Sequence, residues 1–336
     1  MKRGRTLITG FLMILLAGSL AVQGRGLAAP QTVIVSPHGP YTSLSQALNA
    51  ARAGDTIAVH GGVYAGPLVI TKQITLLGYD WPRIEGNGRG TVVTLAAPGI
   101  VVKGFVIRNS GKSLDQENAG IAVEAPAAVI ENNRLEETLF GIYLRKAHHS
   151  RIRHNVIQSK ALPLPRRGDA IRVWYSQGVV IEGNVVEKGR DVVLWYSNNL
   201  TVRNNVVSEG RYGLHFMYCD DALIAGNRLL ANSVGAFLMY SRRLHLRQNI
   251  ITANRGSSGY GVGLKDMDDA VIAENLFLNN RVGAFVDNSP REITSTTRFQ
   301  GNVFAFNDIG ITMLPSVRRN HLTQNSFINN TEQVKI

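Results

Sequence analysis

The sequence predicts an all-β fold, a right-handed single-stranded parallel β-helix with a short N-terminal capping helix. An Asn-centred motif returns about every 22 residues, and a short Gly-led strand of period two lies between successive copies. No helical stretch separates the two, so each coil buries its apolar row only against neighbouring coils. Leucine-rich repeats are the rival fold, but they require a convex helix where this sequence has the Gly-led strand.

The first repeated element reads apolar-x-x-Asn-x-apolar, with Asn-to-Asn spacings of 21 to 29 residues. The longer intervals contain the insertions 162–167, 255–258 and 289–297. We interpret these Asn residues as a ladder of turn amides that satisfy backbone groups and one another, not as ligands. They are Asn133, Asn155, Asn184, Asn205, Asn227, Asn249, Asn275, Asn302 and Asn325.

The second element is a four- or five-residue strand with period-two alternation, entered in most copies by Gly. The residue directly after the first position and the one two further on are expected to point inward. The residues between them are then expected to point outward. The copies begin at Gly120, Gly141, Asp191, Gly213, Gly235, Gly261, Gly283 and Gly310.

Both ends of the repeat carry additional predictions. Residues 42–53 have a helical pattern with Ser43 or Ser45 as the N-cap, and this helix is expected to cover the open first coil. Residues 30–336 are expected to form one domain. Eleven residues follow Asn325 without a capping pattern, so the C-terminal coil is expected to be incomplete.

The N-terminus has the pattern of a secretory signal peptide. Lys2, Arg3 and Arg5 precede an apolar stretch from residue 7 to about 22, and small residues follow at 26–29. We predict a signal peptide at 1–29, cleaved near Ala28 or Ala29, and a periplasmic mature protein. An uncleaved anchor is the alternative, although the apolar stretch is shorter than the roughly 20 residues that a span needs.

Charge and composition exclude several function classes. The formal charge is +12, and without the four cations of residues 1–25 it is +8, which favours acidic partners without naming one. Nucleic acid is not expected for an exported chain. One Cys excludes a disulfide framework, and no P-loop, G-x-S-x-G, H-E-x-x-H or dinucleotide fingerprint occurs. We therefore expect a protein that is not an enzyme.

The outward positions predict a soft-metal site. In this register Met217 and Met239 lie about one strand spacing apart, roughly 4.8 Å, and His215 lies two residues before Met217 on the same face. Thioether and imidazole ligands suit Cu(I), which we expect to be bound transiently. Cys219 and Met267 are possible additional ligands. The alternative is that these Met side chains only pack beneath a loop or a partner chain.

The same outward positions predict a partner-binding surface. Trp174 and Trp195 stand in one column with the two Met residues, and Arg172 and Phe237 stand in the column beside it. An apolar stripe on a solvent face usually marks a binding surface. By contrast, the pairs Asp220–Asp221 and Asp268–Asp269 fall at a turn that accepts Asn or Arg in sister coils. We interpret them as solvated turns and not as catalytic carboxylates.

Four segments of this sequence resemble the NosD family over a match that runs from about Ala29 to the end. They are LPRRGDAIRVWYS (164–176), GRDVVLWYSNN (189–199), GRYGLHFMYCDD (210–221) and GYGVGLKDMDD (259–269). The resemblance implies a pectin-lyase-like solenoid in the group of carbohydrate-binding and sugar-hydrolase-like β-helices. It also implies a periplasmic accessory role in the maturation of nitrous oxide reductase, which belongs to denitrification.

The partners implied by this resemblance are the membrane and ATPase subunits of an ABC transporter, a copper chaperone and nitrous oxide reductase itself. A β-helix that binds or cleaves polysaccharide is the alternative function, since Trp174 and Trp195 could stack on sugars. Sugar cleavage would need acids or a general base in a groove, and the sequence offers such groups only at turns.

Overall fold

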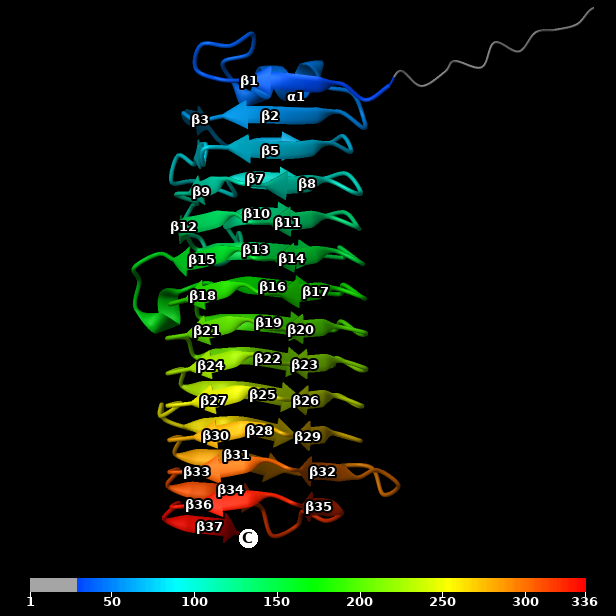
Figure 1. Ribbon diagram of the computed structural model, residues 1–336, viewed down its shortest axis with the longest axis vertical. Helices are drawn as coiled ribbons and strands as arrows, with labels where there is room; N and C mark the ends of the chain where they lie inside the picture. Colours follow the sequence, from blue (N-terminus) through cyan, green and yellow to red (C-terminus); the bar gives the residue numbers. More distant parts are fainter. Residues whose placement is uncertain (1–28) are drawn as a thin grey trace, which may run out of the picture.

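A computed structural model describes residues 29–336, so the predicted signal peptide at 1–29 lies almost entirely outside the described residues. The described chain forms a column of stacked coils, and most coils contribute one strand to each of three parallel sheets (Figure 1). The predicted parallel β-helix is confirmed. Within residues 29–336, no helix has the length and apolar character that a membrane span requires.

Sheet 1 contains 13 strands, each paired in parallel with the strand of the next coil. They are β1 Thr32–Val35, β2 Thr56–His60, β5 Thr75–Tyr79, β8 Val101–Lys103, β11 Val129–Glu131, β14 Arg151–Arg153, β17 Val180–Glu182, β20 Thr201–Arg203, β23 Leu223–Ala225, β26 His245–Arg247, β29 Val271–Ala273, β32 Thr297–Gln300 and β35 Asn320–Thr323.

Sheet 2 follows sheet 1 along the chain and contains 12 strands. They are β3 Val63–Ala65, β6 Arg83–Glu85, β9 Val106–Arg108, β12 Arg134–Thr138, β15 Val156–Ser159, β18 Val185–Glu187, β21 Val206–Ser208, β24 Arg228–Leu230, β27 Ile250–Thr252, β30 Leu276–Leu278, β33 Val303–Ala305 and β36 Ser326–Ile328.

Sheet 3 also contains 12 strands and is built largely from the Gly-led element. They are β4 Leu68–Ile70, β7 Val93–Leu95, β10 Ala119–Val123, β13 Phe140–Arg145, β16 Ile171–Trp174, β19 Asp191–Trp195, β22 Tyr212–Met217, β25 Val234–Met239, β28 Tyr260–Lys265, β31 Val282–Asp287, β34 Ile309–Met313 and β37 Glu332–Lys335.

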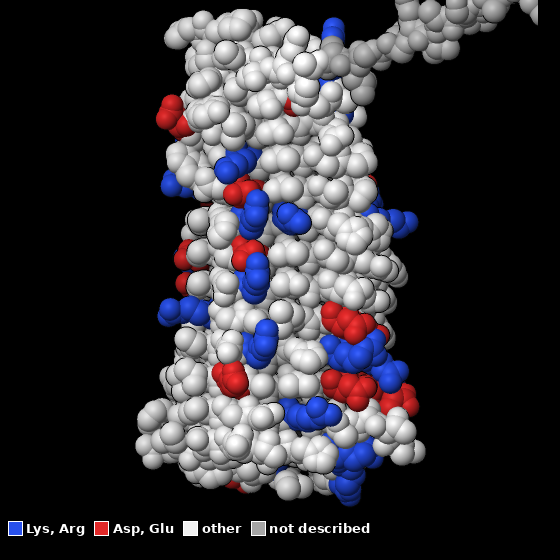
Figure 2. Space-filling model, turned by 45° about the vertical axis from the view of Figure 1, so that its right-hand side comes forward, with Lys and Arg blue, Asp and Glu red and all other residues white. Residues whose placement is uncertain are grey.

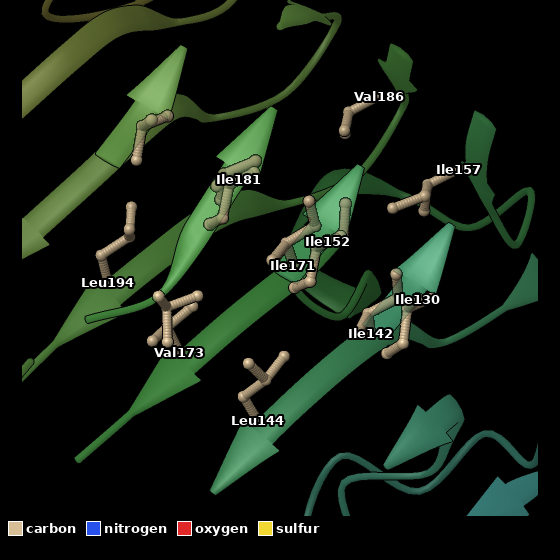
Figure 3. Packing of buried hydrophobic residues seen from close by; sticks show 14 of the residues in the cluster. Ile130, Ile142, Leu144, Ile152, Ile157, Ile171, Val173, Ile181, Val186 and Leu194 are labelled. Atoms are coloured by element: carbon tan, nitrogen blue, oxygen red, sulfur yellow. The ribbon is translucent and has the colours of Figure 1, made fainter. Parts of the chain in front are cut away.

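The core fills the space that the three sheets enclose. Ile142 of β13, Ile152 of β14 and Ile157 of β15 are fully buried and come from three different sheets of one coil (Figure 3). β-Branched side chains suit such pleated surfaces. Burying an aliphatic side chain of this size stabilises the fold by about 1.5–3 kcal/mol, so the stacked apolar rows hold the coils together.

The predicted asparagine ladder is confirmed at the turn between sheets 1 and 2. The Asn155 amide nitrogen donates to the Asn184 Oδ1 at 3.0 Å and to the Ile130 carbonyl at 2.9 Å. Its own Oδ1 accepts the Asn133 backbone N–H at 3.0 Å. The pattern repeats down the column, so each buried amide is satisfied by its neighbours.

A second asparagine ladder lies at the turn between sheets 2 and 3. There the Asn254 amide nitrogen donates to the Asn280 Oδ1 at 2.9 Å, and the Asn280 amide nitrogen donates to the Asn307 Oδ1 at 3.1 Å. These residues lie five positions after members of the first ladder, a spacing that the sequence analysis did not use. Both ladders fix the rungs in register.

The N-terminal helix is confirmed as α1, Leu44–Ala50, packed against β1 and β4. Ser43 is its N-cap and accepts the backbone N–H of Gln46. At its other end the Lys72 ammonium donates to three carbonyls near the helix C-terminus, where cations are favoured. A 3₁₀ turn, Leu164–Arg166, lies in the first insertion.

Candidate metal and partner site on the outer face of sheet 3

The predicted outward column on sheet 3 is confirmed by the strand register. Trp174 pairs with Trp195, Trp195 with Met217, and Met217 with Met239. All four side chains are partly exposed. Two aromatic and two thioether groups therefore follow one another along the outside of β16, β19, β22 and β25.

Charged residues bound this column at both ends. Arg145 lies one coil before Trp174 and pairs with Glu124 at 2.6 Å. Lys265 lies one coil after Met239 and pairs with Asp287 at 2.9 Å. The column of two Trp and two Met side chains is thus four coils long, and an ion pair lies at each of its ends.

His215 stands in the neighbouring column, between Val193 and Phe237. It lies on the outer side of β22 but is only 7% exposed. The imidazole centroid is 5.2 Å from the Trp195 ring and 4.9 Å from the Tyr212 ring, both in edge arrangements. The three predicted metal ligands therefore lie on two adjacent strands, with His215 deeper than the thioethers.

A buried carboxylate holds one side of this imidazole. The Asp191 Oδ2 lies 3.6 Å from the His215 Nδ1, and Asp191 also accepts the Arg211 guanidinium and the Tyr212 backbone N–H. Burial acts to raise the pKa of Asp191, but the neighbouring His215 imidazole and Arg211 guanidinium hold this pKa below its ordinary value. Asp191 therefore stays ionised beside the imidazole.

A register shift brings this carboxylate to the histidine. Asp191 pairs with Tyr212 and Val193 with His215, so β22 has one more residue than β19 over this stretch. Such bulges re-aim side chains and are common beside functional sites. The sequence analysis placed Asp191 at the first position of a strand and assigned it no role.

The donor set of this face fits a soft monovalent cation. The Nδ1 of His215 faces Asp191, which leaves Nε2 as the nitrogen available to a ligand. Within residues 29–336, no cluster of three or more His, Cys, Asp or Glu is placed to hold a metal ion. A metal on this face would therefore need the thioethers of Met217 and Met239, and thioethers select Cu(I) over hard cations.

Cys219 and Met267, considered as additional ligands, are wrong for that role. Both side chains are fully buried in the hydrophobic core. Tyr218 and Asp266, which directly precede them, have positive φ angles of 55° and 50°, and this turn ends the strand alternation. Burial also raises the pKa of the Cys219 thiol to about 12, so no thiolate forms.

A ladder of four tyrosines lies directly beside the soft column and was missed by the sequence analysis. Tyr175, Tyr196, Tyr218 and Tyr240 stack with centroid separations of 4.8, 5.0 and 5.1 Å. The signal was present in the sequence as Trp-Tyr-Ser, Trp-Tyr-Ser, Met-Tyr-Cys and Met-Tyr-Ser. The first three side chains are 47%, 37% and 45% exposed.

The tyrosines occupy an unfavourable backbone position. Their φ angles lie between 47° and 55°, a region that bulky residues rarely adopt. Flanking coils place Lys146, Asp266 and Asn288 at the same turn. Strain of about 1–3 kcal/mol for each residue is comparable to or larger than the roughly 0.5–1.5 kcal/mol expected for each stacked pair. Stability alone therefore gives little reason for four successive tyrosines here.

The other predicted partner-binding residues differ in exposure. Trp174 and Phe237 are partly exposed, on the same face as the tyrosines. The Arg172 side chain is only 14% exposed and pairs with Glu117 at 2.9 Å. Its guanidinium carbon lies 4.8 Å from the Trp174 centroid and 5.7 Å from the Trp195 centroid. Arg172 thus lies against the aromatic rings instead of projecting into solvent.

The turn beyond the tyrosines carries charges that compensate one another. Arg243 pairs with Asp221 at 2.6 Å, and acidic and basic residues alternate along this side of the column (Figure 2). The prediction of solvated turns is wrong for Asp268, which is 1% exposed. The insertion at 289–297 covers it, and Asp268 Oδ1 accepts the backbone N–H groups of Arg291 and Glu292.

The fold and this face define a parallel β-helix whose outer surface on sheet 3 carries aromatic and thioether side chains. The family model described as periplasmic copper-binding protein (NosD) matches residues 160–336, slightly more than half of the chain and the part that carries this surface. The chain therefore belongs to the NosD family.

Two curated relatives are similar to this chain, and both are named probable ABC transporter binding protein NosD. The Pseudomonas aeruginosa relative is 32% identical over 133 residues, which cover 39% of this chain and 31% of the relative. The Stutzerimonas stutzeri relative is 25% identical over 175 residues, which cover 51% of this chain and 38% of the relative. The matches thus span about a third of either relative.

Solved structures show the same fold at low identity. The A-module of a mannuronan C-5 epimerase from Azotobacter vinelandii aligns with a TM-score of 0.67 and 17% identity, over 87% of this chain and 91% of that one. PfbA, a surface adhesin of Streptococcus pneumoniae, aligns with a TM-score of 0.58 and 13% identity, over 87% of this chain and 88% of that one. An epimerase and an adhesin share this architecture, so the fold alone assigns no activity.

Proposed function

We propose that this chain is a non-catalytic periplasmic accessory protein that assists copper-site assembly of nitrous oxide reductase, together with an ABC transporter. The observation that carries the proposal is the placement of Met217 and Met239 on paired strands beside His215, in a chain of a family described as copper-binding. Copper is the cargo, bound as Cu(I) and passed on.

Each of this chain's residues has a separate role in the proposed site. Met217 and Met239 supply two neutral sulfur donors at the surface, where a partner can reach the ion. His215 supplies Nε2 from a deeper position, and Asp191 orients the ring through Nδ1. Neutral donors hold Cu(I) without the thiolate that a permanent, closed site would use, which suits transfer between proteins.

The proposed partner surface comprises Trp174, Trp195, Phe237 and the tyrosine ladder, with Arg172 holding the indoles in place. Tyr and Trp contribute disproportionately to protein interfaces. The curated relatives are named as ABC transporter binding proteins, which supports a transporter as one partner. A copper chaperone and nitrous oxide reductase are the further partners that we propose.

A polysaccharide-binding role finds less support on this face. The stacked tyrosines cover one another's ring faces at 4.8 to 5.1 Å, so the inner rings offer edges and hydroxyls, not faces, to a ligand. Sugars stack on ring faces. Release of reducing ends from uronate polymers by the purified protein would contradict the proposal.

The test is metal analysis of the protein isolated from the periplasm of cells that reconstitute active nitrous oxide reductase. We expect copper in the wild-type protein and in the control H245A/H321A, whose histidines are exposed and remote from the site. The variant H215Q/M217L/M239L, which retains side-chain size, should lose the copper and lower the copper content of the reductase. Equal copper in all three proteins would contradict the proposal.

The proposed localisation has its own test. N-terminal sequencing of the exported protein should show that the mature chain begins at Ala29 or Pro30, since we propose that the signal peptide is cleaved after Ala28 or Ala29 on export. An exported protein that retains Met1 would instead support a membrane anchor.

A further inference from the structure

We propose that the indole of Trp195 caps the copper ion held by His215, Met217 and Met239, as a π donor that completes the site. This inference rests on the proposed copper site and adds a residue that the His/Met donor set does not include. It gives Trp195 a role at the metal in addition to its place in the partner surface, a role that Trp174, one coil away, does not share.

Trp195 lies next to two of the three proposed ligands. It is the register partner of Met217 on the adjacent strand, roughly 4.8 Å away along the column. Its ring centroid is 5.2 Å from the His215 centroid, with the two planes at 88°. Indoles attract cations within about 6 Å of the ring centre, more strongly than Tyr or Phe rings do. A cation held between His215 and Met217 therefore has this indole as a neighbour.

The proposed ligands leave the positive charge of the ion uncompensated, and a π donor such as the Trp195 indole would reduce this imbalance. One imidazole and two thioethers are neutral, so the ion keeps its positive charge when all three bind. Asp191 lies behind the imidazole, and the Arg211 guanidinium already pairs with it. The negative face of the Trp195 π system offers compensation without an anionic ligand, and the indole also shields a soft ion from water.

Packing alone does not account for an indole at this position. The Nε1 of Trp195 is buried and donates to no other described residue. Leaving a donor unpaired is unfavourable, and Phe or Leu would fill the same place without that penalty. The Arg172 guanidinium carbon lies 4.8 Å from the Trp174 ring centroid and 5.7 Å from the Trp195 centroid, so this cation is closer to Trp174. Trp174 is therefore a matched control in the same column.

The experiment titrates purified full-length mature protein with Cu(I) under anaerobic conditions and follows tryptophan emission. W81F/W174F leaves Trp195 as the single tryptophan. We expect one equivalent of Cu(I) to quench its emission by at least about half, because the ion sits against the indole. W81F/W195F, which retains Trp174, should change little. In a chelator competition, W195L should bind Cu(I) about 3- to 30-fold more weakly than wild type, whereas W81L, which alters the Trp between β5 and β6, should bind as wild type does.

The outcomes separate this inference from the proposed function. If wild type binds Cu(I) through His215 and the two Met residues but Trp195 emission is unchanged and W195L binds equally well, the cap is wrong and the copper site stands. If wild type binds no Cu(I), both are wrong. The emission measurement keeps the test informative even if W195L folds poorly, because it leaves Trp195 in place.

Discussion

Two turns of the same column differ in chemistry. At the turn between sheets 1 and 2, Asn follows Asn from residue 133 to 325, and each amide is satisfied by the next. At the turn between sheets 3 and 1, three exposed tyrosines and the partly exposed Tyr240 occupy a strained position beside Trp and Met residues. The buried, repeated Asn residues stabilise the stack of coils. The tyrosines, whose backbone conformation is unfavourable and whose side chains face solvent, instead indicate a binding role.

The largest expected effect comes from breaking the first turn. N227A should lower the free energy of unfolding by about 3 kcal/mol or more, because it leaves the Val202 carbonyl and the Asn205 N–H without these partners and removes one of the two hydrogen bonds that the Asn249 Oδ1 accepts from residue 227. Urea unfolding measures this loss. N49A, which alters an exposed helix residue, is the control and should change stability by less than about 0.5 kcal/mol.

A pH-dependent effect should follow from Asp169, which lies just before β16, between sheets 2 and 3. Burial outweighs the nearby Arg190 cation and raises the pKa of Asp169 from 3.8 to about 6. The folded state then binds this proton more tightly than the unfolded state does. Its stabilising contribution is complete below about pH 4 and is lost as the pH rises through 6.

The measurement compares wild type with D169N between pH 4 and 7.5. The difference in unfolding free energy should change in favour of D169N by about 2–3 kcal/mol as the pH rises. A difference that stays constant across this range would show that Asp169 keeps the same pKa in both states.

The role of Asp191, the first residue of β19, tests the proposed metal site beside the tyrosine turn. D191N should weaken Cu(I) binding about tenfold, because the amide no longer fixes the His215 tautomer through Nδ1. Chelator competition gives the affinity, and ¹⁵N NMR of the imidazole gives the tautomer. D221N, which alters an exposed carboxylate paired with Arg243, should leave both unchanged. If the His215 tautomer is the same in D191N as in wild type, Asp191 does not orient the imidazole and has no role in the proposed site.

A smaller effect is expected from the tyrosine ladder. Y196N/Y218N should change the free energy of unfolding by less than about 1 kcal/mol, since relief of the positive-φ strain offsets the lost stacking. The Phe277–Phe304 stack in the core, at 4.8 Å, is the contrast, and F304A should cost about 3–5 kcal/mol. If Y196N/Y218N lowers the free energy of unfolding as much as F304A does, the tyrosine ladder has a structural role and the prediction is wrong.

The smallest effect should come from Cys219. C219S should leave Cu(I) affinity unchanged and stability within about 1 kcal/mol of wild type, because Ser197 and Ser241 occupy the same inward turn position in adjacent coils. The folded wild-type thiol should not react with a thiol reagent at pH 7, given its raised pKa. Rapid modification would place this sulfur at the surface.

The sequence alone predicted the features that depend on period and spacing. Strand alternation placed Met217 against Met239, and the repeated Asn predicted the first ladder. The second ladder could have been found in the same way, because Asn232 lies five residues after Asn227, as Asn254 does after Asn249.

Other features depend on backbone angles or contacts that no period reveals. Cys219 was assigned to the wrong face because the positive φ of Tyr218 ends the alternation. Asp268 was expected in solvent because the path of the 289–297 insertion is not encoded in the repeat. The carboxylate beside His215 required the register shift between β19 and β22, which shortens one coil by a residue.

The most direct test of the copper site is an anaerobic competition between the purified protein and a chromophoric Cu(I) chelator. The account predicts one tightly bound Cu(I) in wild type and in H245A/H321A, and a loss of at least about tenfold in affinity in H215Q/M217L/M239L. Affinities that agree within error among the three proteins would contradict it.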